Sequence, residues 1–342
     1  MSKQPKHILA IRFSAMGDVA MTVPVLRAVK QQNPEVKITV LTKAPLAPIF
    51  DIVPDVNVVI ADLKGEHKGI YGLYKLSKKV NNLSIDAVAD LHNVLRTHIL
   101  KFFIRSRPFV RIYKGRKEKA QLVQGKRFEQ LKTTHERYAD VFRKLNVSVD
   151  LSQPTFPEKL GLSSETKNLI GNQGKIIGIA PFAAFKGKAY PIDQMSQVID
   201  ALSSIHKVLL FGGGEKEKQQ LDDLASRKQN VVSLAGILPL KDELAVISNL
   251  ELMVSMDSGN AHLAAMMGVK VITLWGVTHP YAGFYPFNQD PNFALLADRE
   301  VYPKIPTSIY GNKQPEGYEH AIGTISPEQV VDKIKQVLDL PN

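Results

Sequence analysis

The stretch Asp-Ser-Gly-Asn-Ala-His at residues 257–262 combines residue types that can bind an anion. It directly follows the apolar run 250–256, where a buried strand is expected to turn into a helix. Ser258 can cap that helix, and Gly259 lets a ligand approach its first turn, whose free N–H groups attract negative charge. His262 can donate to a phosphate oxygen, and Asp257 can orient the loop or bind a hydroxyl. The stretch therefore predicts an anion site at a helix start.

Two other kinds of site fit this stretch poorly. Asp257, Ser258 and His262 are too close in sequence for a hydrolase relay, and the chain has no G-x-S-x-G elbow. A metal site would need further ligands beside the carboxylate. We therefore expect neither a catalytic triad nor a bound metal here.

A second polar stretch, RFSAMGDV, ends the first apolar run of the chain and includes Ser14, Gly17 and Asp18. Gly17 allows a tight backbone, and Asp18 falls at a helix start. Asp18 suits two roles that the residues alone do not separate, a helix N-cap and a general base. The dinucleotide pattern G-x-G-x-x-G is absent, so this turn does not predict a nicotinamide or flavin site.

Two further stretches, IAPFAAFKGKAYP and FGGGEKEK, follow apolar runs in the second half. In the first, Lys188 can neutralise a phosphate that the backbone N–H groups of Ala183 and Ala184 approach closely. In the second, three glycines admit a ligand, and Glu215 or Glu217 can accept hydrogen bonds from ribose hydroxyls. An exposed loop lysine explains the first stretch equally well, and a plain strand–helix turn capped by Glu explains the second stretch better when it is taken alone.

Positive charge is concentrated in the first half of the chain. The formal net charge is +11, of which residues 1–165 contribute +13 and residues 166–342 contribute −2. Residues 96–144 alone hold 15 basic and 4 acidic side chains. The block predicts an anionic partner, which is nucleic acid, a phospholipid surface or a phosphorylated substrate, unless it is only a solvated surface. Polar residues in and beside it form a candidate acceptor cradle: His92, Asn93, Arg96, Arg111, Lys114, Arg116, Lys117, His135 and Arg137.

The elements that must position these residues alternate along the chain. Strands are predicted at 7–12, 37–42, 57–62, 85–91, 108–113, 175–180, 207–212, 230–236, 250–256 and 269–276. Helices are predicted at 18–32, 93–103, 193–204, 215–227, 241–249, 259–267 and 327–339, with His135 and Arg137 on a further one. A stretch rich in Pro, Gly and Ser at 147–174 predicts a linker. The pattern indicates two doubly wound domains with mainly parallel sheets, and ligands in such sheets bind beyond the carboxyl ends of the strands.

Composition agrees with an intracellular protein of two domains. The chain has 342 residues, of which 44% are hydrophobic, and no cysteine. No apolar run approaches the roughly 18–20 residues of a membrane span, and the N-terminus lacks a signal-peptide core. We expect a cytoplasmic protein.

Taken together, these stretches resemble the ADP-heptose:lipopolysaccharide heptosyltransferase family, glycosyltransferase family 9. The resemblance covers nearly the whole chain and is strongest at its first and last motifs. In order, the motifs are IRFSAMGDVAMTVPVLRAVK, DLHNVLRT, THERY, GIAPFAAFKGKAYP, FGGGEKE, LAGILPLKDELAVI and DSGNAHLAAMMGVKVITLWGVTHP.

The resemblance implies a GT-B fold, in which two Rossmann-like doubly wound domains face a central cleft. Residues 1–165 would form the acceptor-binding domain, and residues 166–325 the domain that binds the nucleotide sugar. Residues 326–342 would form a C-terminal helix that packs back on the N-terminal domain. Ser326 is the predicted N-cap of this helix, with Pro327 in its first position.

The resemblance also assigns roles to residues. Asp18 matches the catalytic base. Donor-binding positions are Ala183, Ala184, Lys188, Glu215, Leu238, Asp257, Ser258, Gly259 and His262. Candidate acceptor-binding positions are Ser14, Gly17, His92, Asn93, Arg96, Arg116 and His135.

The implied activity is inverting, metal-independent transfer of a heptose or related sugar, without a cofactor, from a nucleotide sugar such as ADP-heptose. The expected acceptor is the lipopolysaccharide inner core or a similar acidic glycolipid of the lipid A–Kdo type. We expect a monomer at the inner face of the inner membrane, peripheral to that anionic surface. Two alternatives are a nucleotide-sugar epimerase-like enzyme of the same fold and a nucleic-acid-binding protein. The second lacks any recognised nucleic-acid-binding module, so we expect no nucleic-acid partner.

Overall fold

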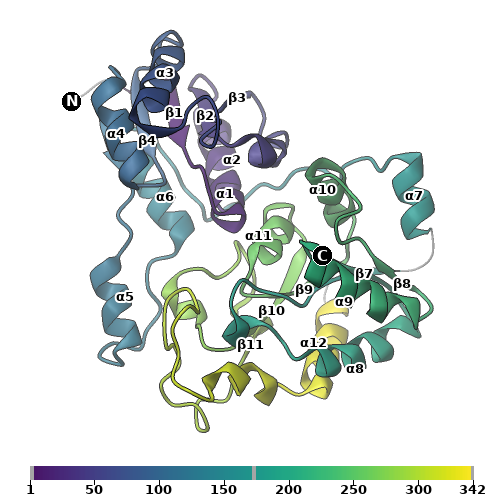
Figure 1. Cartoon of the computed structure of the whole chain (residues 1–342). Coiled ribbons are helices and arrows are strands. Elements are labelled where there is room, and N and C mark those ends of the chain that lie inside the picture. The colour runs from purple at the N-terminus through teal and green to yellow at the C-terminus, as the bar shows by residue number, and fades with distance from the viewer. Residues whose placement is uncertain (1–3, 172–174, 340–342) are drawn as a thin grey trace. The chain divides into compact units, whose positions relative to one another are not determined.

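In the computed structural model, which describes residues 4–171 and 175–339, the chain divides into two compact α/β units (Figure 1). The N-unit comprises the residues up to Lys114 together with Thr134–Pro157. The C-unit comprises Gly115–Thr133 and the residues from Glu158 onward. The residues between 115 and 133, expected in the first domain, therefore pack with the second unit. The boundary falls at Pro157, inside the predicted linker but before the domain boundary expected after residue 165.

The N-unit is built on a five-stranded sheet in the order β3-β2-β1-β4-β5, and all of its paired strands are parallel. The strands are β1 His7–Ile11, β2 Lys37–Thr42, β3 Val56–Ile60, β4 Ala87–Asp90 and β5 Phe109–Arg111. The α-helices are α1 Met16–Ala20, α2 Thr22–Gln32, α3 Gly69–Asn81, α4 Leu95–Phe103 and α6 Thr134–Arg143. Sequence analysis missed α3, which fills the long interval between β3 and β4.

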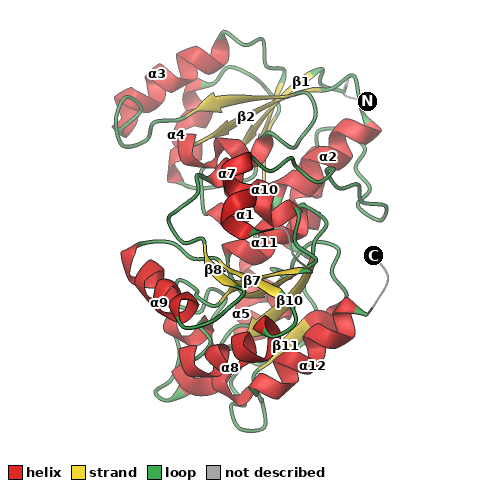
Figure 2. Cartoon of the chain, turned by 90° about the vertical axis from the view of Figure 1, so that its right-hand side faces the viewer, coloured by secondary structure: helices red, strands yellow, loops and turns green. Residues whose placement is uncertain are grey.

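Helices cover both faces of this sheet (Figure 2). One face packs α3 and α4 through a shared apolar core with β1, made by Leu9, Ile11, Leu73, Leu76, Val80, Leu100 and Ile104. On the other face α2 packs against α6. The right-handed preference of parallel crossovers accounts for this division, because the chain leaves β1 toward one edge and returns through β4 toward the other.

The C-unit is built on a six-stranded parallel sheet in the order β11-β10-β9-β6-β7-β8. Its strands are β6 Ile176–Ala180, β7 Lys207–Leu210, β8 Val231–Ser233, β9 Leu252–Met256, β10 Lys270–Trp275 and β11 Ala294–Leu296. Its α-helices are α5 Arg116–Val123, α7 Ser164–Ile170, α8 Ile192–Ser203, α9 Glu215–Ser226, α10 Leu240–Ser248, α11 Gly259–Met266 and α12 Pro327–Leu338. Sequence analysis missed α5, β11 and α7, the last of which lies inside the predicted linker and is capped by the Ser163 side chain.

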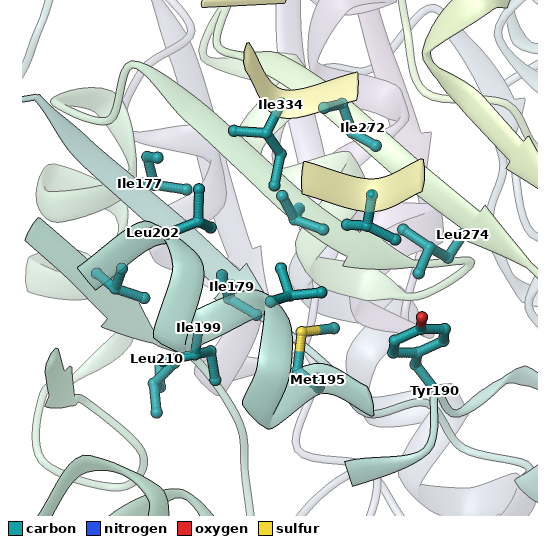
Figure 3. Packing of buried hydrophobic residues seen from close by; sticks show 14 of the residues in the cluster. Ile177, Ile179, Tyr190, Met195, Ile199, Leu202, Leu210, Ile272, Leu274 and Ile334 are labelled. Carbon is teal, nitrogen blue, oxygen red and sulfur yellow. The ribbon is translucent and has the colours of Figure 1, made fainter. Parts of the chain in front are cut away.

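The last helix packs within the C-unit. Val330, Ile334 and Val337 of α12 recur at helical spacing and join the core formed by β6, β10 and α8, as Figure 3 shows for Ile334 beside Ile272. The prediction that this helix packs back on the N-terminal domain is therefore wrong for its apolar side chains, which pack inside the C-unit. Its start is as predicted, because the Ser326 and Gln329 side chains cap each other's backbone N–H groups.

No helix in the described part of the chain is long and apolar enough to cross a membrane.

Candidate functional site

Each sheet contains one point where the order of its strands reverses. In the N-unit the chain runs from β1 outward to β3 and then returns to place β4 on the other side of β1. In the C-unit it runs from β6 to β8 and then places β9 beside β6. Loops that follow two such neighbouring strands diverge and leave a crevice, which is where open α/β sheets bind ligands. The strongest predicted motifs follow these four strands.

In the N-unit, Asp18 is held by an arginine that sequence analysis did not pair with it. Arg12 directly follows β1, and its Nη2 lies 2.5 Å from Asp18 Oδ2, while its Nη1 donates to the Leu91 carbonyl at 2.8 Å. The same Asp18 oxygen accepts from the Ala15 N–H at 3.3 Å, across the start of α1. Asp18 is the third residue of α1, whose N-cap is Ala15, so the alternative role of Asp18 as the N-cap is wrong. Its Oδ2 stabilises the helix start, while its Oδ1 accepts no hydrogen bond from the described residues.

The β4 end brings His92 into the same charged environment. Its ring packs edge-on against Phe13 at 5.7 Å, and the residue is only 9% exposed. Burial, reinforced by the nearby charges of Arg12 and Lys114, lowers the pKa of His92 to about 3. His92 is therefore a neutral hydrogen-bonding group at physiological pH, and it does not add positive charge for an acidic acceptor.

Asn93 serves mainly to shape this turn. Its Nδ2 donates to the Ile112 carbonyl at 2.9 Å, and its Oδ1 lies 2.7 Å from His98 Nε2. The buried Asp90 carboxylate accepts from the backbone N–H groups of His92 and Asn93 and closes the turn. The predicted acceptor role of Asn93 stays a prediction, with its side chain already engaged inside the N-unit.

The other predicted acceptor residues differ in their placement. Ser14 and Gly17 are half-buried in the turn before Asp18, and Arg96 is exposed on the first turn of α4. His135 is buried on α6. Arg116 is exposed at the first position of α5 and thus belongs to the C-unit. The structure gathers Ser14, Gly17 and Asp18 in one turn, whereas Arg116 lies in a different unit from the rest.

In the C-unit, Lys188 and Asp257 form an ion pair at the β6–β9 reversal point. Lys188 Nζ lies 3.0 Å from Asp257 Oδ2, and both side chains are about nine-tenths buried. The same carboxylate oxygen accepts from Thr278 Oγ1 at 2.9 Å. An ammonium group carries three donors, so Lys188 can hold Asp257 and still donate to a phosphate.

A glycine lets the lysine adopt this position. Gly311 has a φ of +80°, and a Cβ placed there would lie 2.6 Å from Lys188 Cδ. Sequence analysis identified neither Gly311 nor Thr278, because their roles depend on loops far along the chain. No local pattern marks them.

The start of α11 lacks a side-chain cap. Ser258 occupies the N-cap position in extended conformation, but its hydroxyl lies 3.0 Å from Ser255 Oγ and makes no capping hydrogen bond to the helix. The capping role predicted for the Ser258 side chain is therefore wrong, because the strand-end serine offers a nearer partner. Gly259 begins the helix, and His262 is buried in its first turn. Uncapped N–H groups and the helix dipole favour an anion at this end.

The other residues predicted to bind the nucleotide-sugar donor follow β6, β7 and β8, which lie in this order away from the β6–β9 reversal point. Ala183 and Ala184 follow β6, Glu215 is the first residue of α9 after β7, and Leu238 lies half-buried after β8. Glu217, the alternative acid, accepts from the Gly213 N–H at 2.9 Å, whereas Glu215 is exposed. The carboxyl edge of the sheet thus carries polar groups at its centre, an exposed acid next to them, and an apolar side chain at the outer strand.

A half-buried acid in the same unit was not predicted from the sequence. Glu243 lies in the first turn of α10, the helix that follows Leu238, and burial raises its pKa from 4.5 to about 7. Acidic residues are common in the first turn of any helix, so its sequence position gave no signal.

No group of three His, Cys, Asp or Glu side chains within residues 4–171 and 175–339 has the arrangement of a metal site.

Comparison with known proteins supplies the family. The model of glycosyltransferase family 9, described as heptosyltransferase, matches residues 73–306, more than half of the chain. The chain belongs to glycosyltransferase family 9. This family member is therefore a glycosyltransferase, as the order of its motifs implied.

Relatives with assigned names are distant but extend over most of the chain. The lipopolysaccharide core heptosyltransferase OpsX of Haemophilus influenzae is 23% identical over 288 residues, which are 82% of this chain and 81% of the relative. Lipooligosaccharide heptosyltransferase 2 of Campylobacter jejuni is 22% identical over 328 residues, which are 94% and 95% of the two chains.

Solved structures support the fold. The glycosyltransferase family 9 protein of Veillonella parvula superposes with a TM-score of 0.78 at 20% identity, covering 99% of this chain and 98% of that one. The Escherichia coli heptosyltransferase WaaC with ADP gives a TM-score of 0.73 at 20% identity, covering 97% and 99%. The family 9 member thus has the GT-B fold of two Rossmann-like units, as expected.

Proposed function

We propose that this family 9 member transfers a heptose from ADP-heptose to the lipopolysaccharide inner core, with inversion at the anomeric carbon. The observation that carries the proposal is the order of groups along the carboxyl edge of the second sheet. Lys188 and the uncapped start of α11 lie where the strand order reverses, Glu215 follows the next strand, and Leu238 follows the outer strand. This order suits a diphosphate, a ribose and a base in turn.

Family membership supports the choice of sugar, because the matching family is described by heptose transfer. The names of relatives support the acceptor, since they act on lipopolysaccharide or lipooligosaccharide. A relative of the same fold has been solved with ADP, which supports an adenine nucleotide as the donor's leaving group.

In the proposed reaction, Asp18 is the general base. An acceptor hydroxyl loses its proton to Asp18 Oδ1 as its oxygen attacks the anomeric carbon of the donor. The bond between that carbon and the β-phosphate oxygen breaks on the opposite face, and ADP leaves. Arg12 holds Oδ2 by an ion pair and thereby directs the second oxygen of the carboxylate away from the arginine.

Negative charge grows on the β-phosphate as the bond breaks. Lys188, the N–H groups at the start of α11 and His262 would stabilise that charge, so we propose that no metal and no cofactor is needed. Asp257 and Thr278 act as positioning residues, because they fix the lysine before the donor arrives. A metal chelator should therefore leave the transfer rate unchanged.

The decisive experiment supplies the purified chain with ADP-heptose and a Kdo-bearing lipid A acceptor. The expected products are ADP and an acceptor heavier by one heptose, with the opposite anomeric configuration from the donor. Consumption of the donor without acceptor would instead favour the epimerase-like alternative. Asp18→Asn should lower kcat by about a hundredfold or more while ADP binding persists. Asp55→Asn, at an exposed carboxylate of the same unit, is the matched control.

For partners and location, we propose a cytoplasmic monomer that acts at the inner face of the inner membrane and binds no nucleic acid. Light scattering of the purified chain tests the monomer directly.

A further inference from the structure

Two neighbouring helices of the N-unit, α3 and α4, form a surface that the proposed reaction does not use apart from the candidate acceptor residue Arg96. The side chains of both helices that face the sheet pack in the apolar core over β1. Their ends are fastened together, because Asn81 Nδ2 donates to the Phe103 carbonyl at 3.0 Å and Asn81 Oδ1 accepts from the Arg105 N–H at 2.9 Å. The rings of Tyr74 and Phe103 also meet edge-on at 5.5 Å. The two helices therefore present one continuous outer face (Figure 1).

Large apolar side chains project from this outer face. Phe102 is 84% exposed, Leu95 75% and Tyr71 70%, and Ile70 and Tyr74 are exposed as well. Single exposed apolar residues are ordinary on a protein surface, but several on two packed helices mark an interaction site.

The same face is positively charged. Neither α3 nor α4 contains an acidic residue, whereas together they carry Lys75, Lys78, Lys79, Arg96 and Lys101. Lys79 is paired at 3.0 Å with Glu66, which precedes α3, so the excess positive charge comes from the other four. Two of the lysines lie over the exposed tyrosines: Lys75 Nζ is 5.1 Å from the ring centre of Tyr71, and Lys78 Nζ is 4.7 Å from that of Tyr74. Apolar and cationic groups are thus interleaved at contact distance.

We infer that this α3–α4 surface, made of Ile70, Tyr71, Tyr74, Leu95 and Phe102 with the basic residues of both helices, docks on an anionic lipid bilayer. Aromatic and aliphatic side chains insert at the boundary between headgroups and acyl chains, where a tyrosine hydroxyl still reaches water. Lysines extend their charged ends toward lipid phosphates, and each adds attraction to an anionic leaflet.

Charge decides between this occupant and a second copy of the chain. A symmetric contact between two α3–α4 surfaces would oppose lysines to lysines, and the neighbouring acid Glu66 is already paired with Lys79 of its own copy. Duplex nucleic acid would satisfy the lysines through its phosphates but gives no gain to the exposed apolar side chains. A single strand can stack bases on Tyr71 or Phe102 but gives no gain to the aliphatic Leu95 and Ile70. A bilayer satisfies both kinds of side chain at once.

Docking on a bilayer would bring the enzyme to its lipid-linked acceptor, and in this respect the inference rests on the proposed function. Lipid binding is nevertheless measured without donor or acceptor. Failure of docking and failure of heptose transfer are therefore separate results.

The test is sedimentation of the full chain with vesicles of phosphatidylcholine, with and without phosphatidylglycerol. Binding is expected on the anionic vesicles, at least about tenfold tighter than on the zwitterionic ones, and weaker at high salt. The variant Lys75→Gln/Lys78→Gln should lose about twentyfold in affinity at low salt. Tyr71→Ser/Phe102→Ser should lose about tenfold or more and should do so at high salt too.

Matched controls come from the C-unit. Ile205→Ser/Val301→Ser removes two side chains that are 71% and 61% exposed, and Lys333→Gln/Lys335→Gln removes one half-buried and one exposed lysine. Both controls should bind vesicles as the unaltered chain does, and circular dichroism should show all four variants folded.

Three results would overturn the inference. The first is equal binding to both kinds of vesicle, or binding to neither. The second is loss of binding in the control variants to the same extent. The third is a dimer, or a complex with a polynucleotide, that Tyr71→Ser/Phe102→Ser or Lys75→Gln/Lys78→Gln disrupts while vesicle binding is absent.

Discussion

Lys188 and Asp257 are 69 positions apart in the chain, yet Lys188 Nζ lies 3.0 Å from Asp257 Oδ2 where β6 and β9 run side by side. Thr278, which follows β10, donates to the same oxygen. Three neighbouring strands thus each contribute one member of a buried polar cluster. Because its only cation is also the proposed phosphate ligand, stability and donor binding are coupled in this cluster.

Lys188→Ala is expected to weaken both properties. It leaves the carboxylate of Asp257 buried without its cation, which should lower the free energy of unfolding by about 3 kcal/mol. ADP affinity should fall about tenfold or more. Denaturant unfolding and calorimetric titration with ADP measure the two effects.

The variant Lys186→Ala, at an exposed lysine of the same loop, serves as the control and should change neither quantity. Lys188→Met/Asp257→Asn should be more stable than Lys188→Ala, since no charge is then left unpaired. Equal stability of Lys186→Ala and Lys188→Ala would contradict the coupling.

Gly311→Ala is expected to disturb the lysine without touching any charge. The new Cβ would lie 2.6 Å from Lys188 Cδ and would displace the side chain, so ADP affinity should fall. Gly317 shares a positive φ, +81°, but a Cβ there meets nothing within 4 Å. Gly317→Ala therefore pays the same backbone strain, about 1 kcal/mol, and should bind ADP normally. Similar ADP affinities in the two variants would show that Gly311 does not position Lys188.

Arg12→Lys is expected to slow the reaction while donor binding persists. The guanidinium bonds both Asp18 and the Leu91 carbonyl, and a single ammonium on a flexible stem does not reproduce that fork. We expect kcat to fall about tenfold, with the Kd for ADP unchanged, because the proposed ADP site lies in the other unit. Steady-state kinetics and titration separate the two quantities. A change confined to KM for the donor would argue against a role for Arg12 in positioning Asp18.

Glu243→Gln is expected to stabilise the protein above pH 7 and to have little effect near pH 4.5. Burial raises the pKa of Glu243 from 4.5 to about 7, so the folded state binds its proton more tightly than the unfolded chain. Stability from this group is therefore full below pH 4.5 and is lost as pH rises toward 7. The glutamine amide has no proton to lose, so the variant avoids this decrease in the free energy of unfolding, which amounts to about 3 kcal/mol.

Unfolding measured across this pH range tests the prediction, with Glu300→Gln at an exposed position as the control. A difference between Glu243→Gln and the unaltered chain that does not vary with pH would show that the carboxyl is not buried as a proton-binding group.

The sequence by itself determined the local features of this protein. Alternation of apolar runs with amphipathic segments predicted most strands and helices of both units, because side-chain periodicity is set by the local backbone. The cap at Ser326 was predicted for the same reason. The sequence also predicted the polar stretches at the ends of β1, β4, β6 and β9, since each directly follows an apolar run.

Tertiary structure alone decided which of these stretches meet. The pairing of β6 with β9 brings Lys188 to Asp257, and the fold of the β1 turn brings Arg12 to Asp18. It also placed residues 115–133, part of the basic block, in the C-unit, where Leu122 and Leu131 pack around Ala282. Such contacts depend on strand order and on apolar burial between distant segments, which no local period encodes.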